Sequence, residues 1–402
     1  MKKKISVLAL VSMFAAGSAM ASGWRIPEQS VDSTAKAGAN IASSTRADTA
    51  YYNPANMAWM SDTWHLEVDT TWIHLTEIDY QDSRNPLLSG SSEAENFYVP
   101  TGFVVTPSYG GARFGLAITA PGGLSKQWED TWPKTFAEEF SLTVIEVNPT
   151  VSYSVGKVSL AAGPRMVYSS ATVTSSGAIP GAGVLARDMD GDTTEWGWNA
   201  AFSAKPTEKI NISATYRSHI DLDFEDTATL TFGSIINRDF DAVPLPAVLA
   251  FSVAYDVLDN LNVELTWDRT FWSKYKDLNF NFSPVIPGNP FEPPVEKNWD
   301  DSNAFRLGLT YTLTDYLTLM GGFAYDQTPV PTETIGFELP DSPAWIYSLG
   351  AQYAVTDKMD IGIAALYDYK QSRTAKDSKG YVDGEFTDAA AFLLTVGLNY
   401  RF

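Results

Sequence analysis

The feature that most constrains this chain is a series of segments in which apolar and polar side chains alternate. In the first, residues 63–80, every second position from Trp64 to Trp72 is apolar or neutral, and the positions between them carry His65, Glu67 and Asp69. Successive side chains of a β-strand point to opposite faces, so this pattern predicts a strand with one apolar face. Such a face packs either into the core of a soluble sandwich or against lipid.

About fourteen such segments follow one another, separated by turn residues. They lie near 63–80, 96–107, 111–120, 139–154, 158–174, 194–205, 210–230, 244–256, 261–282, 299–312, 316–327, 343–355, 359–373 and 389–402. Short connections, such as 155–157, 258–260 and 356–358, alternate strictly with long ones. Bacterial outer-membrane barrels combine an even strand number with short periplasmic turns and long extracellular loops, and a sandwich has no reason to sort its loops by length. We therefore predict an all-β fold, a transmembrane antiparallel β-barrel.

The last predicted strand supports the same fold. Every second residue from Phe392 to the terminal Phe402 is apolar or aromatic. A chain that ends on an aromatic residue after such alternation resembles the signal read by the barrel-assembly machinery, which we expect as a partner. By the same alternation, the following side chains are expected to face lipid: Leu307, Leu309, Leu349, Ile361, Ile363, Leu394 and Val396.

Residues 1–21 have the features of a secretory signal peptide. Lys2, Lys3 and Lys4 precede an apolar run from Ile5 to about Ala16, and Ala19-Met20-Ala21 is a small-x-small cleavage site. The apolar run is too short to cross a bilayer comfortably, which argues against a membrane anchor. We predict that the mature chain begins at Ser22.

Composition narrows the class further. No later stretch is apolar enough for a membrane helix, so an exported chain of this kind spans the membrane as a closed barrel. The net charge is −20, which becomes about −23 without the three signal lysines and argues against nucleic acid as a partner. Cysteine is absent, which excludes disulfides and thiolate metal sites.

The segment 22–60 differs from everything after it. It is rich in Ala, Ser and Gly, lacks strand-like alternation and contains Asn53-Pro54-Ala55. Its Ser22-Gly23-Trp24, Ala37-Gly38-Ala39 and Asn53-Pro54-Ala55 are similar to the hatch of the FadL-type outer-membrane transporters, and the resemblance covers nearly the whole mature chain. It implies a signal peptide (1–21), a hatch inside the lumen (22–60) and a barrel (61–402).

The resemblance also implies a function. FadL-type proteins carry long-chain fatty acids or monoaromatic hydrocarbons across the outer membrane of Gram-negative bacteria. We expect passive diffusion of a hydrophobic small molecule with lateral release, by a monomer in contact with outer-membrane lipid and lipopolysaccharide, without a cofactor. A general porin for polar solutes and a surface adhesin remain alternatives. An enzyme is not expected, because the chain has three histidines and neither a G-x-S-x-G nor an H-E-x-x-H motif.

Two sites are candidates for the conformational features of such a transporter, the hatch and the opening in the wall. Asn53-Pro54-Ala55 predicts a tight turn, which either leads into the first strand or pins a movable hatch. Gly122 and Gly123 follow Pro121 at the end of the third predicted strand, where proline and glycine favour a bulge or kink. In FadL-type proteins a kink in the third strand opens the wall to the bilayer, so Gly122 and Gly123 are candidates for it.

Candidate ligand-binding residues fall into two groups. Trp128, Trp132, Phe136 and Phe140 recur at a spacing of four, which predicts one face of a helix broken at Pro133. In the family this loop forms an apolar groove for ligand capture.

The second group consists of Arg165, Arg217 and Arg306, which alternation directs into the lumen. They either form ion pairs with carboxylates of the hatch and wall or bind the carboxylate of a fatty acid. For the luminal carboxylates Glu67 and Asp69, Lys36 and Arg46 are the expected partners in the hatch.

Overall fold

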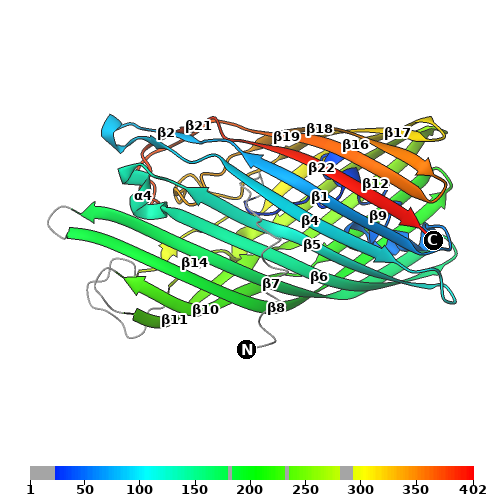
Figure 1. Cartoon of the computed structure of the whole chain (residues 1–402), viewed down its shortest axis with the longest axis horizontal. Coiled ribbons are helices and arrows are strands. Elements are labelled where there is room, and N and C mark those ends of the chain that lie inside the picture. Colours follow the sequence, from blue (N-terminus) through cyan, green and yellow to red (C-terminus); the bar gives the residue numbers. More distant parts are fainter. Residues whose placement is uncertain (1–22, 180–182, 231–234, 281–292) are drawn as a thin grey trace.

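The computed structural model describes residues 23–179, 183–230, 235–280 and 293–402. They form a closed antiparallel barrel of fourteen strands, as predicted (Figure 1). The barrel closes where β1 pairs with β22, with His65 opposite Arg401 and Leu75 opposite Ala391. Among the described residues, no helix is both long and apolar enough to cross a membrane.

The wall strands follow one another in chain order. Two of them are interrupted and carry two labels each, β9 with β10 and β11 with β12. The bounds are β1 (His65–Leu75), β4 (Glu95–Val105), β5 (Ala112–Gln127), β6 (Glu139–Val155), β7 (Val158–Ile179), β8 (Gly183–Thr207), β9 (Ile210–Arg217), β10 (Ile220–Leu230), β11 (Ile235–Leu245), β12 (Ala247–Leu258), β13 (Leu261–Phe271), β16 (Ser302–Thr314), β17 (Leu317–Asp326), β18 (Ala344–Thr356), β19 (Met359–Lys370) and β22 (Ala390–Arg401).

The alternation of side chains along these strands is as predicted. In β1, Glu67 and Asp69 are buried in the lumen, whereas Val68 between them is half exposed on the outer surface. Leu309, Leu349, Ile361, Ile363 and Val396 are exposed on the same outer surface, and Leu307 and Leu394 are partly exposed there. The outer surface of the barrel is therefore an apolar band of the kind that faces lipid.

Connections are sorted by length, which also confirms the prediction. The short ones are 106–111, 156–157, 208–209, 259–260, 315–316 and 357–358, and they lie at the end of the barrel where the chain terminates (Figure 1). We assign this end to the periplasm because outer-membrane barrels keep their short turns there.

The opposite end carries additional structure. A four-stranded sheet of β2 (Asp79–Asp82), β3 (Gly90–Ser91), β20 (Arg373–Ala375) and β21 (Gly384–Thr387) stands beyond the wall strands, with the pair β14 (Asp277–Leu278) and β15 (Val295–Glu296). The short helices there are η2 (Pro86–Leu88), α4 (Thr131–Ala137) and η3 (Trp272–Lys274).

The predicted broken helix is wrong. α4 is one short helix, and Pro133 lies in its first turn, where a missing N–H costs no hydrogen bond. Trp128 follows the end of β5, and Phe140 belongs to β6. The spacing of four therefore does not reflect one helical face.

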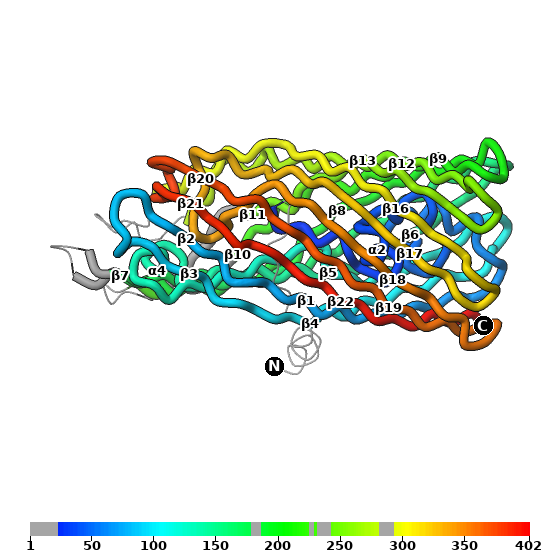
Figure 2. Tube along the Cα trace, turned by 90° about the horizontal axis from the view of Figure 1, so that it is seen from above, coloured from blue at the N-terminus to red at the C-terminus, as the bar shows by residue number. Residues whose placement is uncertain are grey.

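The N-terminal segment lies inside the barrel, in its periplasmic half (Figure 2). Its helices are α2 (Val31–Ala35), α3 (Thr49–Tyr52) and η1 (Pro54–Trp59). The wall is built to accept α2 closely: a Cβ on Gly322 of β17 would lie 2.2 Å from the Lys36 carbonyl carbon, so any larger residue there would displace the helix. This arrangement fits a hatch.

Candidate functional site

The motif Asn53-Pro54-Ala55 begins a 3-10 helix of the hatch. The Asn53 side chain accepts from the Ala55 N–H (3.2 Å), and its amide donates to the Ile41 carbonyl and to Ser213 of the wall (both 2.9 Å). Pro54 occupies the first helical position, which tolerates a missing N–H. The turn therefore joins two parts of the hatch to each other and to β9.

Buried polar contacts attach the part of the hatch that follows residue 29, called its body, to several strands of the wall. Glu264 of β13 accepts the N–H groups of Ile41, Ala42 and Ser43 at 2.7–2.9 Å. Arg46 pairs with Asp360 (2.6 Å) of β19. Unsatisfied polar groups are costly in a closed lumen, so these contacts hold the hatch in one position.

The partners expected for Glu67 and Asp69 are not the ones found. The Lys36 ammonium donates to Asn40 and Ser43 within the hatch, and Glu67 instead accepts the backbone N–H of Asp48 (2.8 Å). Loop conformation in the hatch, which alternation cannot predict, decides these pairings.

All three predicted arginines lie in ion pairs with carboxylates of the wall. Arg165 and Arg217 share Glu146, with Arg165 at 2.8 Å. Arg306 pairs with Asp268 (2.8 Å) and Asp326 (3.1 Å) and donates to the Ala37 carbonyl of the hatch (2.9 Å). This geometry favours the structural alternative over ligand binding for each of them.

The third wall strand has a β-bulge directly before the predicted glycines. β5 continues to Gln127, beyond the predicted end near residue 120, and its register with β6 shifts between Thr119 and Gly122. On its other side, β5 pairs with β4 only from Gly102 opposite Ile118 to Val105 opposite Gly115. Gly122 therefore follows directly on a bulge, and a gap in the β4–β5 ladder opens beside it.

Two prolines explain why the ladder stops. Thr106 donates to the Phe114 carbonyl, so the same register would place Pro100 opposite Ala120. Pro100 has no N–H to offer, and Pro121, inside the bulge, has none either. The β4–β5 ladder accordingly ends at Ile118. Beyond the gap, Ser125 donates to Glu95, and backbone hydrogen bonding resumes where Glu93 donates to the Gln127 carbonyl (2.9 Å).

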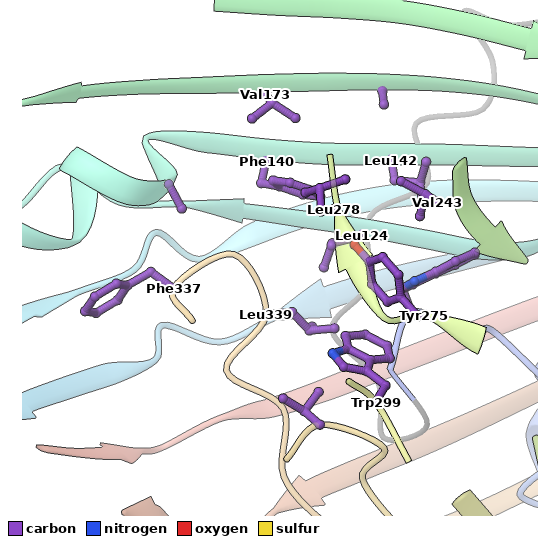
Figure 3. Close-up of a cluster of buried hydrophobic side chains, with 14 of the residues drawn as sticks. Leu124, Phe140, Leu142, Val173, Val243, Tyr275, Leu278, Trp299, Phe337 and Leu339 are labelled. Atoms are coloured by element: carbon purple, nitrogen blue, oxygen red, sulfur yellow. The ribbon is translucent and has the colours of Figure 1, made fainter. Parts of the chain in front are cut away.

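A cluster of buried apolar side chains, called the chamber below, packs in the lumen between the hatch and the extracellular cap, which consists of the sheet β2–β3–β20–β21 and the loops around it (Figure 3). Wall residues such as Leu124 and Leu142 meet loop residues such as Trp299, Phe337 and Leu339 there. The hatch contributes Trp24, whose ring lies 5.2 Å from that of Trp272. In the described part of the chain, the indole N–H groups of Trp24 and Trp272 have no hydrogen-bond partner.

The four predicted aromatic residues all reach this chamber. Trp128 and Phe140 are buried in it, and Trp132 and Phe136 pack against it. Trp128 donates to the Phe337 carbonyl (2.9 Å), and Phe136 stacks on Phe337 (5.8 Å). The structure thus brings the four side chains to one apolar cluster, although the helix that was expected to align them does not exist, and their role in ligand binding stays a prediction.

One cation in the chamber lacks a close partner. Lys126 of β5 lies two positions after Leu124 and two before Trp128, which follows the strand, and it is 1% exposed. Its ammonium lies 3.3 Å from the Ser92 hydroxyl and 4.0 Å from Glu95 Oε2. Lys297 and Lys370, by contrast, bind Glu338 and Asp341 directly.

The four-stranded sheet β2–β3–β20–β21 covers the extracellular end of the chamber. Tyr80 of β2 donates to Asp82 (2.8 Å) and packs on Phe337 and Phe386 (5.0 and 4.9 Å between ring centres). Burial raises the pKa of Tyr80 to about 12, so its hydroxyl remains a donor at neutral pH.

A pocket of about 590 Å³ opens beside Trp128 at the extracellular end, between α4, β7, β8 and β10. Lys134, Glu138 and Arg187 line it together with Trp128. A second pocket of about 600 Å³ lies at the periplasmic end and is lined by polar residues that include Arg46, Asn211 and Asp360. The chamber therefore lies between two pockets, one at each end of the barrel, whose linings include charged side chains.

Sequence reasoning missed Lys126 and the tryptophans Trp24, Trp272 and Trp299. Lys126 lies two residues before Trp128. If the strand had been predicted to extend to Gln127, alternation would have placed Lys126 on the same face as Trp128. Trp24 was noted only as part of the hatch motif, and Trp272 and Trp299 lie in segments far apart from it in the sequence, so no local pattern linked the three rings.

A barrel with an apolar outer surface and an N-terminal hatch in its lumen defines an outer-membrane transport protein. Comparison with known proteins specifies the family. The family "Outer membrane protein transport protein (OMPP1/FadL/TodX)" matches residues 12–402. The chain belongs to this family, whose members are outer-membrane transporters of hydrophobic compounds.

Relatives cover most of the chain. Outer membrane protein P1 of Haemophilus influenzae is 25% identical over 99% of both chains. The long-chain fatty acid transport protein of Salmonella typhi is 24% identical over 78% of this chain and 79% of that one.

Two crystal structures share the fold. A Pseudomonas aeruginosa FadL homologue superimposes with a TM-score of 0.84 at 20% identity over 95% of this chain and 100% of that one. The Ralstonia pickettii toluene transporter TbuX gives a TM-score of 0.71 at 18% identity over 93% and 98%.

Proposed function

We propose that this protein takes up long-chain fatty acids through the outer membrane by passive diffusion. The observation that carries the proposal is Lys126, a buried ammonium whose nearest carboxylate oxygen is 4.0 Å away and which shares a strand face with the apolar residues of the chamber. A fatty acid has one carboxylate and a long apolar chain, and this site offers one partner for each.

The chamber supplies the driving force for capture. Apolar surface gains about 25 cal/mol per Å² on leaving water, so an acyl chain is drawn from the extracellular mouth to the rings around Phe337. The carboxylate then approaches Lys126. Elsewhere in the chamber, the indole N–H groups of Trp24 and Trp272 are further donors without partners among the described residues. The name of the Salmonella typhi relative supports the same substrate class.

The gap between β4 and β5 is the proposed exit. Val99, Ile118 and Ala120 belong to an apolar cluster at this gap, so an acyl chain can pass there without meeting charge. Exit through the hatch would instead lead past the ion pairs that join it to the wall, Arg25 with Asp268 and Arg46 with Asp360, to a polar periplasmic pocket. Release into the bilayer is therefore the proposed route.

A monoaromatic hydrocarbon is the second candidate. The chamber walls are largely aromatic rings, which accept such a ligand without any cation. A porin for polar solutes fits less well, because the hatch lies within the periplasmic half of the lumen (Figure 2) and is joined to the wall there by buried polar contacts.

Uptake of radiolabelled oleate and toluene by cells with and without the gene tests the proposal. We expect gene-dependent oleate uptake that Lys126→Met lowers by about tenfold or more, since one charge-assisted hydrogen bond is lost. Toluene uptake should be the same in both proteins. Lys126→Met leaves the Glu95 carboxylate without its neighbouring ammonium. The double variant Lys126→Met with Glu95→Gln removes that charge as well and controls for its effect. Gene-dependent toluene uptake without oleate uptake would replace the fatty acid by the hydrocarbon, and uptake of neither would reject both.

A further inference from the structure

The bulge in β5 leaves backbone groups that neither neighbouring strand can satisfy. Ala120 has its N–H and its C=O directed at the gap, opposite the position that Pro100 would occupy. At membrane depth, an unsatisfied backbone group costs several kcal/mol because lipid offers no partner. Something other than the wall must therefore satisfy Ala120.

The side chain of Gln29 in the hatch does so. Its Nε2 donates to the Ala120 carbonyl (2.8 Å), and its Oε1 accepts from the Ala120 N–H (2.8 Å). These two bonds have the arrangement of a hydrogen-bonded pair in an antiparallel ladder, with an amide side chain in place of a peptide. Gln29 is fully buried, and Thr101 of β4 donates to its carbonyl (2.7 Å). One residue thus connects both edges of the gap.

The residues before Gln29 continue the same replacement. Ile26 donates to the Pro121 carbonyl (3.0 Å), Arg25 forms a bridge with Gly122, and Gly123 donates to the Trp24 carbonyl (2.9 Å). The segment 24–29 is therefore a surrogate strand that covers the gap from inside. Ile26 packs there with Val99 and Ala120.

We propose that Gln29 is the latch of the wall gap: its amide holds the gap closed, and its release from Ala120 opens the path from the lumen to the bilayer. The proposal rests on lateral release, which is part of the proposed function. It adds the residue that regulates this step. An amide suits the role because rotation of one side chain breaks both bonds, whereas separating two paired strands breaks a whole ladder.

The test measures opening directly. The chain has no cysteine, so Ile26→Cys places a single thiol behind the gap. The probe is N-dodecylmaleimide dissolved in the bilayer of proteoliposomes, compared with a charged, water-soluble maleimide. Gln29→Met removes both bonds at similar volume, and Gln29→Glu removes the donor while keeping the acceptor. We expect either change to raise lipid-phase labelling of the introduced thiol by about tenfold, as one or two lost hydrogen bonds predict.

Gln352→Met is the matched control. Gln352 also donates from a wall strand to the hatch, at Asp32 (2.8 Å), but its strand is paired on both sides. Its loss should leave labelling of the introduced thiol unchanged. Folding of every variant is checked by its heat-dependent mobility on gels. If folded Gln29→Met and Gln29→Glu label at the parental rate, or if Gln352→Met accelerates labelling equally, Gln29 is not the latch.

Oleate uptake separates this proposal from the proposed function. Faster labelling together with altered oleate uptake supports both. Faster labelling without any gene-dependent oleate uptake keeps the latch and rejects the substrate.

Discussion

At the scale of single residues, buried charges in the lumen differ in how completely they are paired. Arg165 has Glu146 at 2.8 Å and the Ser218 carbonyl at 2.7 Å, whereas Lys126 has one hydroxyl at 3.3 Å and a carboxylate oxygen at 4.0 Å. A closely paired guanidinium gains nothing from a ligand carboxylate, and a loosely paired ammonium does. The first kind of residue stabilises the barrel, and the second is available for binding.

Replacement of Arg165 should therefore affect stability and not selectivity. Arg165→Met leaves Glu146 with Arg217 alone and removes the donor of the Ser218 carbonyl, and a buried polar group left without its partner costs about 1–3 kcal/mol. We expect a lower midpoint in urea unfolding followed by gel mobility, with oleate and toluene uptake reduced in proportion to folded protein. Arg269→Met is the control, because its pair with Asp301 is half exposed and is worth about 1 kcal/mol or less. Selective loss of oleate uptake in folded Arg165→Met would instead make Arg165 a ligand residue.

At the scale of elements, the strands were predictable and the contacts between hatch and wall were not. Alternation and loop length are local properties, so β1, the short turns and the lipid-facing residues could be read directly. Contacts such as Gln29 with Ala120 join residues 91 positions apart through loops without a repeating pattern. Even the extent of β5 was underestimated, because Pro121 and two glycines indicate a strand end as much as a bulge.

The gap itself follows from single residues in β4 and β5. Pro100 and Pro121 remove two donors, and the Thr119/Gly122 register shift turns β5 away from its neighbour. The opening in the wall thus follows from these few residues of β4 and β5, and the hatch covers it from inside.

Pro100→Val should narrow the gap. Valine supplies an N–H opposite Ala120, which competes with the Gln29 amide for the same carbonyl and favours pairing of β4 with β5. We expect oleate uptake to fall about fivefold, the effect of one net hydrogen bond, with unchanged oleate binding to the purified protein. Pro107→Val, in the periplasmic turn 106–111 at the other end of β4, serves as control. Unchanged uptake by folded Pro100→Val would show that the missing donor does not keep the gap open.

At the scale of the whole molecule, the question is which part of the hatch moves. Its body is held by Glu264 at residues 41–43, by Arg46 with Asp360 and by Arg306 with the Ala37 carbonyl. Breaking a buried ion pair costs about 3–5 kcal/mol, and displacement of the body would break several contacts at once. The segment 24–29 has two longer ion pairs with the wall, Arg25 with Asp268 (3.2 Å) and Glu28 with Arg306 (3.8 Å). Asp268 and Arg306 keep each other as partners (2.8 Å) when these two pairs open. We infer that the body stays in place.

A disulfide between hatch and wall tests this inference. The Thr34 and Thr395 hydroxyls are 2.9 Å apart, so Thr34→Cys with Thr395→Cys places two sulfurs within bonding reach and ties α2 to β22. Thr71 lies at the same distance from Thr395, and Thr71→Cys with Thr395→Cys gives a matched bond within the wall. We expect oleate uptake to be the same before and after oxidation in both pairs, because release requires only the segment around Gln29. A loss of uptake on oxidation of the 34–395 pair, reversed by reduction and absent from the 71–395 pair, would show that the body of the hatch must move.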